Sequence, residues 1–197
     1  LEIYTNRLEN VRLDGAGNLI IEARAETMGG CNYTSGSIIT QCKQYFTFGR
    51  VEARIKTFDA GKGYWPAFWM LGKSALWEGW PACGEIDILE LIGPEPNRAY
   101  GTTHTTDGTG THVSSGGNYT LPSGTFSDAY HVFAIEWQQD RIDFFVDSNL
   151  YLTVIPSNFP PGSNWAFNEP FFILLNVAIG GSWPGTPDGT SVFPNQT

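Results

Sequence analysis

The chain has 197 residues, with 20 acidic and 11 basic side chains and a formal net charge of −9 at pH 7. This length suits one domain with a substantial core, and we expect a single domain over residues 1–197. No basic run stands out, which argues against nucleic acid as a partner, because phosphate binding needs clustered Lys and Arg. The longest apolar stretch is too short to span a bilayer and no signal peptide is present, so we expect no membrane partner.

Short segments of alternating apolar and polar residues recur along the chain and predict strands. The 23 glycines and 12 prolines are spread through the sequence and mark many turns, and no segment shows a helical stripe of any length. The stretch 74–81, SALWEGWP, is expected to form a loop with at most one helical turn. The sequence therefore predicts an all-β fold, with strands at 18–26, 49–57, 99–105, 141–148 and 171–181.

The segment 84–90, GEIDILE, places three carboxylates in a run that otherwise has the composition of a buried strand. In a regular strand Glu85 and Asp87 share one face, whereas Glu90 falls on the apolar face with Ile86 and Ile88. An ionised carboxylate without a partner is costly there. A β-bulge between Asp87 and Glu90 removes the conflict, because it turns all three acids to one side.

Three acids on one face suit chemistry at a sugar carbon. With the bulge, Glu85 and Glu90 stand like residues four apart, with Cα atoms about 13 Å from each other. Their carboxyl groups can lean inward to the separation of about 5 Å that double displacement requires. Asp87, between them, would restrain a neighbour's charge through hydrogen bonding and coupled titration. The hexapeptide alone leaves open a second interpretation, three acids on a solvated strand face.

A turn at residues 93–97, GPEPN, would fold the chain back as a hairpin. Glu90 then falls near Tyr100 and, after the bulge, Glu85 falls near His104. We predict that His104 lies in the cleft and bonds sugar or carboxylate; the alternative is a surface histidine.

Seven tryptophans are many for this length. Their flat faces suit the apolar faces of pyranose rings, so some of them are candidates for sugar binding. Trp65 and Trp183 lie beside glycine and proline in loops and are predicted sugar platforms. Trp69 is a candidate for either the cleft or the core, and Trp137 and Trp165 are expected in the core.

Two further polar residues are candidates for substrate contact. Arg50 follows Gly49 directly and could reach a sugar hydroxyl, although its alternation with Glu52 and Arg54 also fits a salt-bridge ladder. Asn176 is a polar residue in the apolar strand at 171–181, where it either lines the cleft or satisfies a neighbour.

Three cysteines, Cys31, Cys42 and Cys83, leave at least one unpaired. A tight turn at residues 36–37 would place Cys31 opposite Cys42 and permit a disulfide; otherwise both are ordinary thiols. Neither the spacing nor the neighbouring residues indicate zinc.

Several segments together resemble laminarinases of glycoside hydrolase family 16. GEIDILE resembles the catalytic signature of that family in its bulged form, with two residues between the aspartate and the second glutamate. Other segments match in the same order, so that nearly the whole chain is covered. The matching segments are 4–26, 49–57, 63–72, 80–93, 135–148 and 174–185.

The resemblance implies a jelly-roll β-sandwich of two antiparallel sheets with a concave substrate cleft. It implies a secreted enzyme, an endo-β-1,3-glucanase that hydrolyses β-1,3-glucan with retention. Glu85 would be the nucleophile, Glu90 the general acid/base and Asp87 the supporting carboxylate. The expected partner is β-glucan polysaccharide, the expected state is a monomer, and the chemistry is expected to need no cofactor.

The sequence differs from the family pattern at both ends. By that resemblance, the N-terminal stretch and the last C-terminal strand that supply ligands to a structural calcium in many members are missing here, so such a calcium is possible but not expected. Alternative functions are hydrolysis of mixed-linkage β-1,3-1,4-glucan or another polysaccharide of the family, and β-glucan binding without catalysis. Non-catalytic relatives typically lack the two glutamates, both of which are present here.

Overall fold

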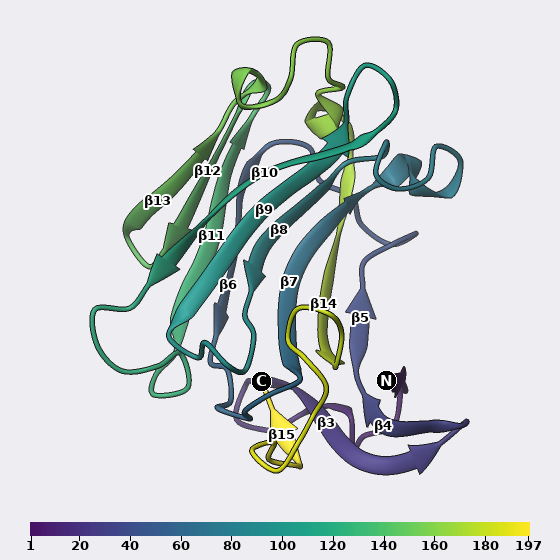
Figure 1. The fold of residues 1–197 in the computed structure, drawn as a ribbon, viewed down its shortest axis with the longest axis vertical. Helices are drawn as coiled ribbons and strands as arrows, with labels where there is room; N and C mark the ends of the chain where they lie inside the picture. The colour runs from purple at the N-terminus through teal and green to yellow at the C-terminus, as the bar shows by residue number, and fades with distance from the viewer.

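The computed structural model describes residues 1–197, apart from the side chain of Gln196. Its strands form three sheets (Figure 1). The widest is antiparallel throughout, with strand order β10-β9-β8-β7-β14-β5. Strand β8 therefore lies in the interior of a six-stranded sheet. Its strands are β5 (Ser37–Ile39), β7 (Tyr64–Gly72), β8 (Glu85–Glu90), β9 (Arg98–Thr106), β10 (His112–Thr120) and β14 (Phe171–Ile179).

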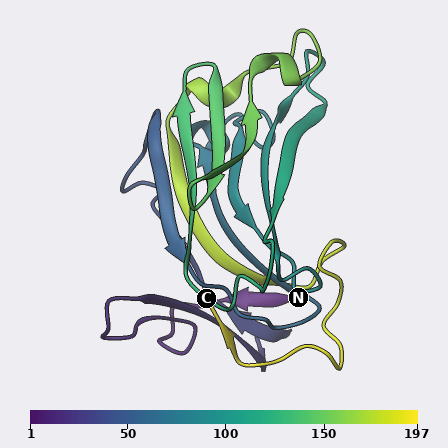
Figure 2. The same cartoon turned by 90° about the vertical axis from the view of Figure 1, so that its left-hand side faces the viewer.

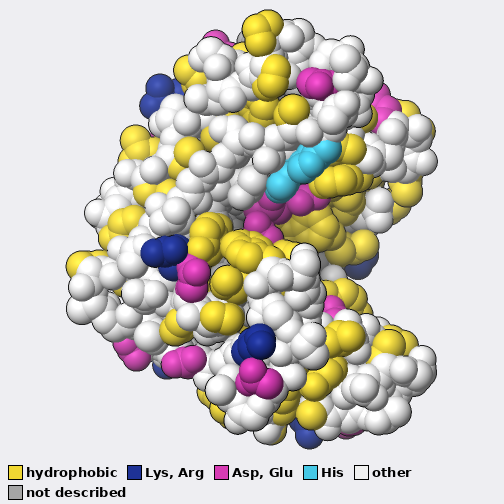
Figure 3. Space-filling model, viewed as in Figure 1, with side chains coloured by type: hydrophobic (Ala, Val, Ile, Leu, Met, Phe, Trp, Pro, Cys, Tyr) yellow, Lys and Arg dark blue, Asp and Glu magenta, His cyan; other side chains and the backbone are white. Residues whose placement is uncertain are grey.

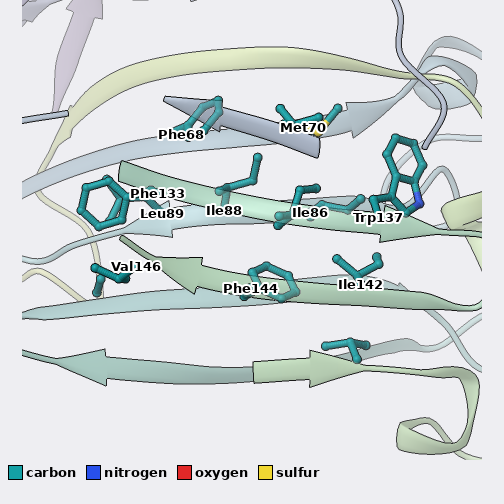
Figure 4. Packing of buried hydrophobic residues seen from close by; sticks show 14 of the residues in the cluster. Phe68, Met70, Ile86, Ile88, Leu89, Phe133, Trp137, Ile142, Phe144 and Val146 are labelled. Carbon is teal, nitrogen blue, oxygen red and sulfur yellow. The ribbon is translucent and has the colours of Figure 1, made fainter. Parts of the chain in front are cut away.

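A four-stranded antiparallel sheet, in the order β13-β12-β11-β6, faces the first one and completes a sandwich (Figure 2). Buried side chains from the two sheets, among them Phe68, Ile86, Phe133 and Phe144, meet between them (Figure 4). One face of the six-stranded sheet is thus committed to the core. The strands of this second sheet are β6 (Gly49–Ile55), β11 (His131–Gln138), β12 (Arg141–Val146) and β13 (Asn149–Val154).

The third sheet lies at one end of the sandwich, where both chain termini are found (Figure 1). Its order is β1-β4-β3-β15, and β1 runs parallel to β4. Strand β2 pairs with the first residues of β3, 19–21. A second small core, including Ile21, Tyr64 and Ile179, joins it to the sandwich. Its strands are β1 (Glu2–Tyr4), β2 (Val11–Leu13), β3 (Leu19–Met28), β4 (Cys31–Ser35) and β15 (Asn195–Gln196).

The helical content of the described chain consists of short 3-10 turns. They are η1 (Lys73–Leu76), η2 (Pro156–Asn158) and η3 (Ala166–Asn168). No helix among the described residues has the length and apolar character needed to cross a bilayer. The single turn η1 starts the segment that the sequence predicts as a loop with at most one helical turn.

Period-two alternation explains how the sheet divides its side chains. Along β7, Phe68 and Met70 are buried in the core, whereas Trp65 and Trp69 lie on the opposite face and are half-buried. The prediction of an all-β sandwich is confirmed, and each of the five predicted strands is present with its ends shifted by a few residues at most. Trp137 is buried in the core, and Trp165 packs against it.

The predicted turn at residues 36–37 does not form a hairpin. Strand β4 pairs with β3 and β1, whereas β5 pairs with β14, so the chain passes from one sheet to another at this point. Cys31 and Cys42 are therefore not opposed, and all three cysteines are free thiols.

Candidate active site

Strand β8 contains the expected bulge. Against β9, Glu85 pairs with His104 and Asp87 with Thr102, but Glu90 already pairs with Tyr100, so that three steps on β8 match two on β9. This register confirms both predicted neighbours, Tyr100 for Glu90 and His104 for Glu85. The extra residue keeps Ile86, Ile88 and Leu89 in the core and leaves the acids on the other side.

Two glycines permit this geometry. Gly101 lies on β9 beside the bulge, where a Cβ atom would come within 2.4 Å of the Tyr151 hydroxyl and 2.7 Å of the Phe144 ring. Gly84, directly before Glu85, has a φ of +77°, which L side chains rarely adopt. The close packing at the bulge and the turn into β8 both depend on the missing side chains.

The acids lie in a hollow of the surface, beside histidine side chains and hydrophobic residues (Figure 3). Glu85 and Glu90 are partly exposed, whereas Asp87 is 3% exposed. Burial raises the pKa of Glu85 to about 8, and the neighbouring charge of Asp87 adds to the shift. Burial, followed by the charge of Glu90, raises the pKa of Asp87 well above its ordinary range. The Glu85–Asp87 pair therefore tends to hold a proton near neutral pH.

Glu90 has a different partner from the other two acids. Nε1 of Trp65 donates a hydrogen bond to Oε1 of Glu90 at 3.1 Å. Burial raises the pKa of Glu90 to about 7, while the hydrogen bond from Trp65 and the charge of His104 oppose that rise. A carboxyl group with this pKa retains its proton in part of the population at neutral pH, which suits a general acid.

His104 faces the acids from β9, as predicted. Its Nε2 lies 3.1 Å from Oδ2 of Asp87 and 3.9 Å from Oε1 of Glu85. The contact with Asp87 is close but not straight, so this buried oxygen accepts no well-aligned hydrogen bond. The imidazole thus lies within reach of the Asp87 carboxyl group, and proton exchange between them requires that the two groups first align.

An aromatic cluster borders Glu90. The rings of Trp65 and Trp183 meet edge to face at 5.7 Å between centroids, and Tyr100 meets Trp183 in the same manner at 4.8 Å. Trp183 is 40% exposed. The two predicted sugar platforms, Trp65 and Trp183, are therefore in contact with each other and close to a catalytic candidate.

Trp69 and Asn176 are joined on the same face of the sheet. Nε1 of Trp69 donates to Oδ1 of Asn176 at 2.8 Å, and Nδ2 of Asn176 donates to the Tyr4 hydroxyl at 3.1 Å. Register places Asn176 opposite Ala67, between Trp65 and Trp69 along β7. Both residues thus line the acid-bearing face, and Asn176 also satisfies its neighbour.

Arg50 is not brought to the site, and its predicted contact with sugar in this cleft is wrong. It lies on β6 in the opposite sheet, where its side chain is exposed and pairs with Glu52 at 2.7 Å and Glu136 at 3.0 Å. Its guanidinium also lies over the Phe145 ring. The salt-bridge ladder, the alternative that the alternation allowed, is what the structure contains.

Three residues around the site were not among the predicted site residues: Trp80 and His112, which lie beside His104, and Tyr4, which bonds Asn176. The Trp80 ring lies 4.8 Å from His112 and 6.1 Å from His104 between centroids. A signal for Trp80 was its place four residues before the motif. Tyr4 reaches Asn176 from 172 positions away along the chain, and no local pattern indicates that contact.

The donor set at the site does not fit calcium. Glu85, Asp87 and His104 offer ligand atoms within 4.8 Å of one another. Calcium prefers a shell of six to eight oxygens, whereas this group supplies one imidazole nitrogen and two carboxyl groups. We therefore assign no calcium to these residues.

A cavity of about 750 Å³ is lined by residues of β3, β6, β7 and β14, and it shares Asn176 with the acid-bearing face. Its lining includes Ile21, Ile55 and Leu175 and none of the three acids of β8. The paired acids and the aromatic rings identify the reactive site better than cavity size does.

Comparison with known proteins agrees with this geometry. The model of the family described as "Glycosyl hydrolases family 16" matches residues 4–193. A protein of Rhodothermus marinus named "Beta-glucanase" is 40% identical over 207 residues, which cover 100% of this chain and 70% of that protein. "Glucan endo-1,3-beta-glucosidase A1" of Niallia circulans is 35% identical, and the match covers 98% of this chain but only 30% of that protein.

Solved structures give the same result. The laminarinase catalytic domain of Thermotoga maritima superposes with a TM-score of 0.91 at 42% identity. The match covers 100% of this chain and 79% of that one.

Proposed function

Because the chain belongs to glycosyl hydrolase family 16, we propose that it is a retaining endo-β-1,3-glucanase. Relatives named as glucan endo-1,3-beta-glucosidase and laminarinase support this choice of substrate. The observation that carries the proposal is the arrangement of β8, in which a bulge turns Glu85 and Glu90 to one face beside a cluster of indole rings. Their ladder partners, His104 and Tyr100, are four residues apart on β9, which spans about 13 Å between Cα atoms.

In the first step, a carboxylate oxygen of Glu85 attacks the anomeric carbon of a glucose unit. The bond from that carbon to the bridging oxygen breaks, and Glu90 gives its proton to the departing oxygen. The products are a glucosyl ester on Glu85 and a shortened glucan with a free hydroxyl. The pKa of Glu90, raised to about 7 by burial, suits a group that donates a proton near neutral pH, and the family pattern, not the pKa, distinguishes its role from that of Glu85.

In the second step, the Glu90 carboxylate takes a proton from water. The water oxygen attacks the anomeric carbon, and the ester bond to Glu85 breaks. Glu85 returns as a carboxylate and Glu90 returns protonated. Two inversions at one carbon give net retention.

Asp87 regulates the charge of the nucleophile in this scheme. Its burial beside Glu85 means that two full negative charges at this point are unfavourable. When Asp87 holds the proton of the pair, Glu85 is free to attack. When Glu85 is esterified, the charge can return to Asp87 or leave through His104.

We also propose that the enzyme acts on polysaccharide outside the cell, as a monomer and without a cofactor. A polymer substrate too large to enter cells supports the location. The acid pair supports chemistry that needs only protein groups. Sedimentation would test the monomer, and dialysis against a chelator followed by assay would test the need for a metal.

The experiment that tests the proposed function is NMR analysis of the first product released from laminarin, with barley mixed-linkage glucan in parallel. Early formation of the β-anomer from laminarin, with internal cleavage, is the expected result. Cleavage of the mixed-linkage glucan alone would change the assigned substrate to β-1,3-1,4-glucan. An α-anomer would overturn retention, and no product from a folded protein would favour glucan binding without catalysis.

A further inference from the structure

His112 does not contact the three acids directly, but it contacts His104, which does. Its Nε2 lies 2.9 Å from Nδ1 of His104, and the two rings are stacked with 22° between their planes. The other nitrogen of His104, Nε2, is the one that lies 3.1 Å from Asp87. His104 therefore bridges His112 and Asp87.

The β9–β10 hairpin creates this contact. His104 pairs directly with Ser114, and His112 lies two positions along the same strand, so that the two histidines are diagonal neighbours on one face. The Trp80 ring lies 4.8 Å from that of His112. The exposed His112 ring therefore has the His104 imidazole and the Trp80 indole as neighbours.

A contact of 2.9 Å between two ring nitrogens needs one donor and one acceptor. His112 is exposed, and its partial burial and then the charge of His104 lower its pKa, which favours the neutral form. A neutral imidazole has one bare nitrogen that can accept. If Nε2 of His112 is bare, Nδ1 of His104 must carry a hydrogen.

We propose that His112 is a positioning residue that accepts a hydrogen bond from Nδ1–H of His104 and so reserves Nε2 of His104 for proton exchange with Asp87. The proton then moves between Nε2 of His104 and Oδ2 of Asp87. When it leaves the imidazolium, His104 becomes neutral and Asp87 becomes a carboxylic acid, so the charge of the pair is conserved. This role rests on the proposed function, because it deepens the part that Asp87 has in charge control.

The groups that share this electrostatic environment come from two neighbouring strands. Glu85, Asp87 and Glu90 of β8 face His104, and His112 of β10 contacts it from the other side. Asp107, in the turn after β9, is occupied by hydrogen bonds from Thr109 and Thr111 and does not contact either ring in this arrangement. The polar contacts of His104 therefore come mainly from the acids of β8 and from His112.

The first test uses the resting protein and needs no substrate. The chain has three histidines, so ¹H–¹⁵N correlation spectra of the imidazole rings can be assigned by single replacements. We expect a protonated Nδ1 on His104 and a bare Nε2 on His112. A bare Nδ1 on His104 would overturn the proposal whatever the enzyme hydrolyses. His131, which is bonded to Asp147 at 2.9 Å, gives an internal reference.

The second test compares two replacements of His112. His112→Gln keeps an oxygen that can accept from His104, whereas His112→Leu keeps volume but cannot accept. We expect His112→Leu to lower kcat about tenfold or more with little change in KM, and to give a mixture of His104 tautomers. We expect His112→Gln to recover most of the activity and the wild-type tautomer. Equal activity in both variants, or an unchanged tautomer in His112→Leu, would contradict the proposal.

A matched control separates this proposal from the proposed function. His131→Gln alters a histidine away from the acids and should leave both kcat and the His104 signals unchanged. If no β-glucan is cleaved by the wild-type protein, the proposed function fails while the tautomer measurement still decides the contact between His112 and His104.

Discussion

Strands β6 and β8 both carry alternating charged residues, yet only one of them forms a site. On an exposed face of β6, Arg50 pairs with Glu52 of the same strand and with Glu136 of β11, so that these charges are compensated. On β8, three acids of the same sign share a face where burial raises the pKa of each of them. Alternation thus identifies a polar face, whereas uncompensated charge in a low-dielectric environment identifies a reactive site.

The largest expected effect follows from removing one charge on β8. Glu85→Gln or Glu90→Gln should lower kcat on laminarin by about a thousandfold or more, because each removes a group that forms or breaks a bond. Reducing-end release measures turnover, and binding of laminarin to the variants should persist. Loss of both binding and turnover would indicate a folding defect and would weaken the comparison.

The dependence of kcat/KM on pH should show the effect of the raised pKa values on β8. Glu90 must be protonated to donate, and its pKa is raised to about 7, so kcat/KM should fall as pH rises above that value. The Glu85–Asp87 pair must carry a negative charge, and its raised pKa values should move the acidic limb upward as well. We expect a narrow optimum near neutrality, instead of one set by ordinary carboxyl pKa values of about 4.

The same profile has a matched control. The control substrate is an aryl β-laminaribioside, whose phenolate leaves without a proton. With this substrate, Glu90→Gln should still carry out the first step, and kcat/KM should no longer fall on the alkaline side of the pH profile. Persistence of that fall would assign it to another group.

Stability should show a smaller effect with a defined sign. The pKa of Glu90 is higher in the folded state, so its contribution to stability is present below the unfolded pKa of about 4 and is lost as pH rises through about 7. Glu90→Gln should therefore raise Tm at pH 8 and not at pH 4. The gain is at most about 3 kcal/mol, or several degrees. Calorimetry at the two pH values measures it, and an equal shift at both would contradict the electrostatic cause.

The smallest effect belongs to β6. Arg50→Gln removes exposed ion pairs, which contribute about 0.5 kcal/mol or less in this setting. We expect unchanged kcat and KM on laminarin and a Tm within about 2 °C of the wild type. A large loss of activity would mean that the outer face of the four-stranded sheet contacts substrate, and the contrast between the two strands would fail.

The central part of the site could be predicted from sequence because it depends on local rules. Alternation, the cost of placing Glu90 on an apolar face and the turn at 93–97 together give the bulge and the neighbours of Glu85 and Glu90. Each of these signals lies within about 20 residues of the motif. The roles of the acids in catalysis remain predictions for the experiments above.

The periphery of the site could not be predicted in the same manner. Alternation on β6 does not reveal to which sheet Arg50 belongs, because both sheets have strands with one polar face. His112 depends on the length of the turn after β9, since one residue more or less would move its side chain to the other face. Tyr4 depends on the path of the first strand across the end of the sandwich.

Because of the bulge, β8 can lose one residue and still present its three acids on the same face. From Asp87 to Glu90 the strand advances three residues while β9 advances two, and Ile88 is the residue without a counterpart on β7. Deleting Ile88 would leave Glu85, Asp87 and Glu90 at regular alternate positions on the same face. Deletion of Ile86 would instead reverse the facing of Glu85 relative to Asp87. The segment between Asp87 and Glu90 therefore tolerates the loss of one residue, Ile88 or Leu89, without a change in the facing of the acids, whereas such a loss usually disrupts a central strand.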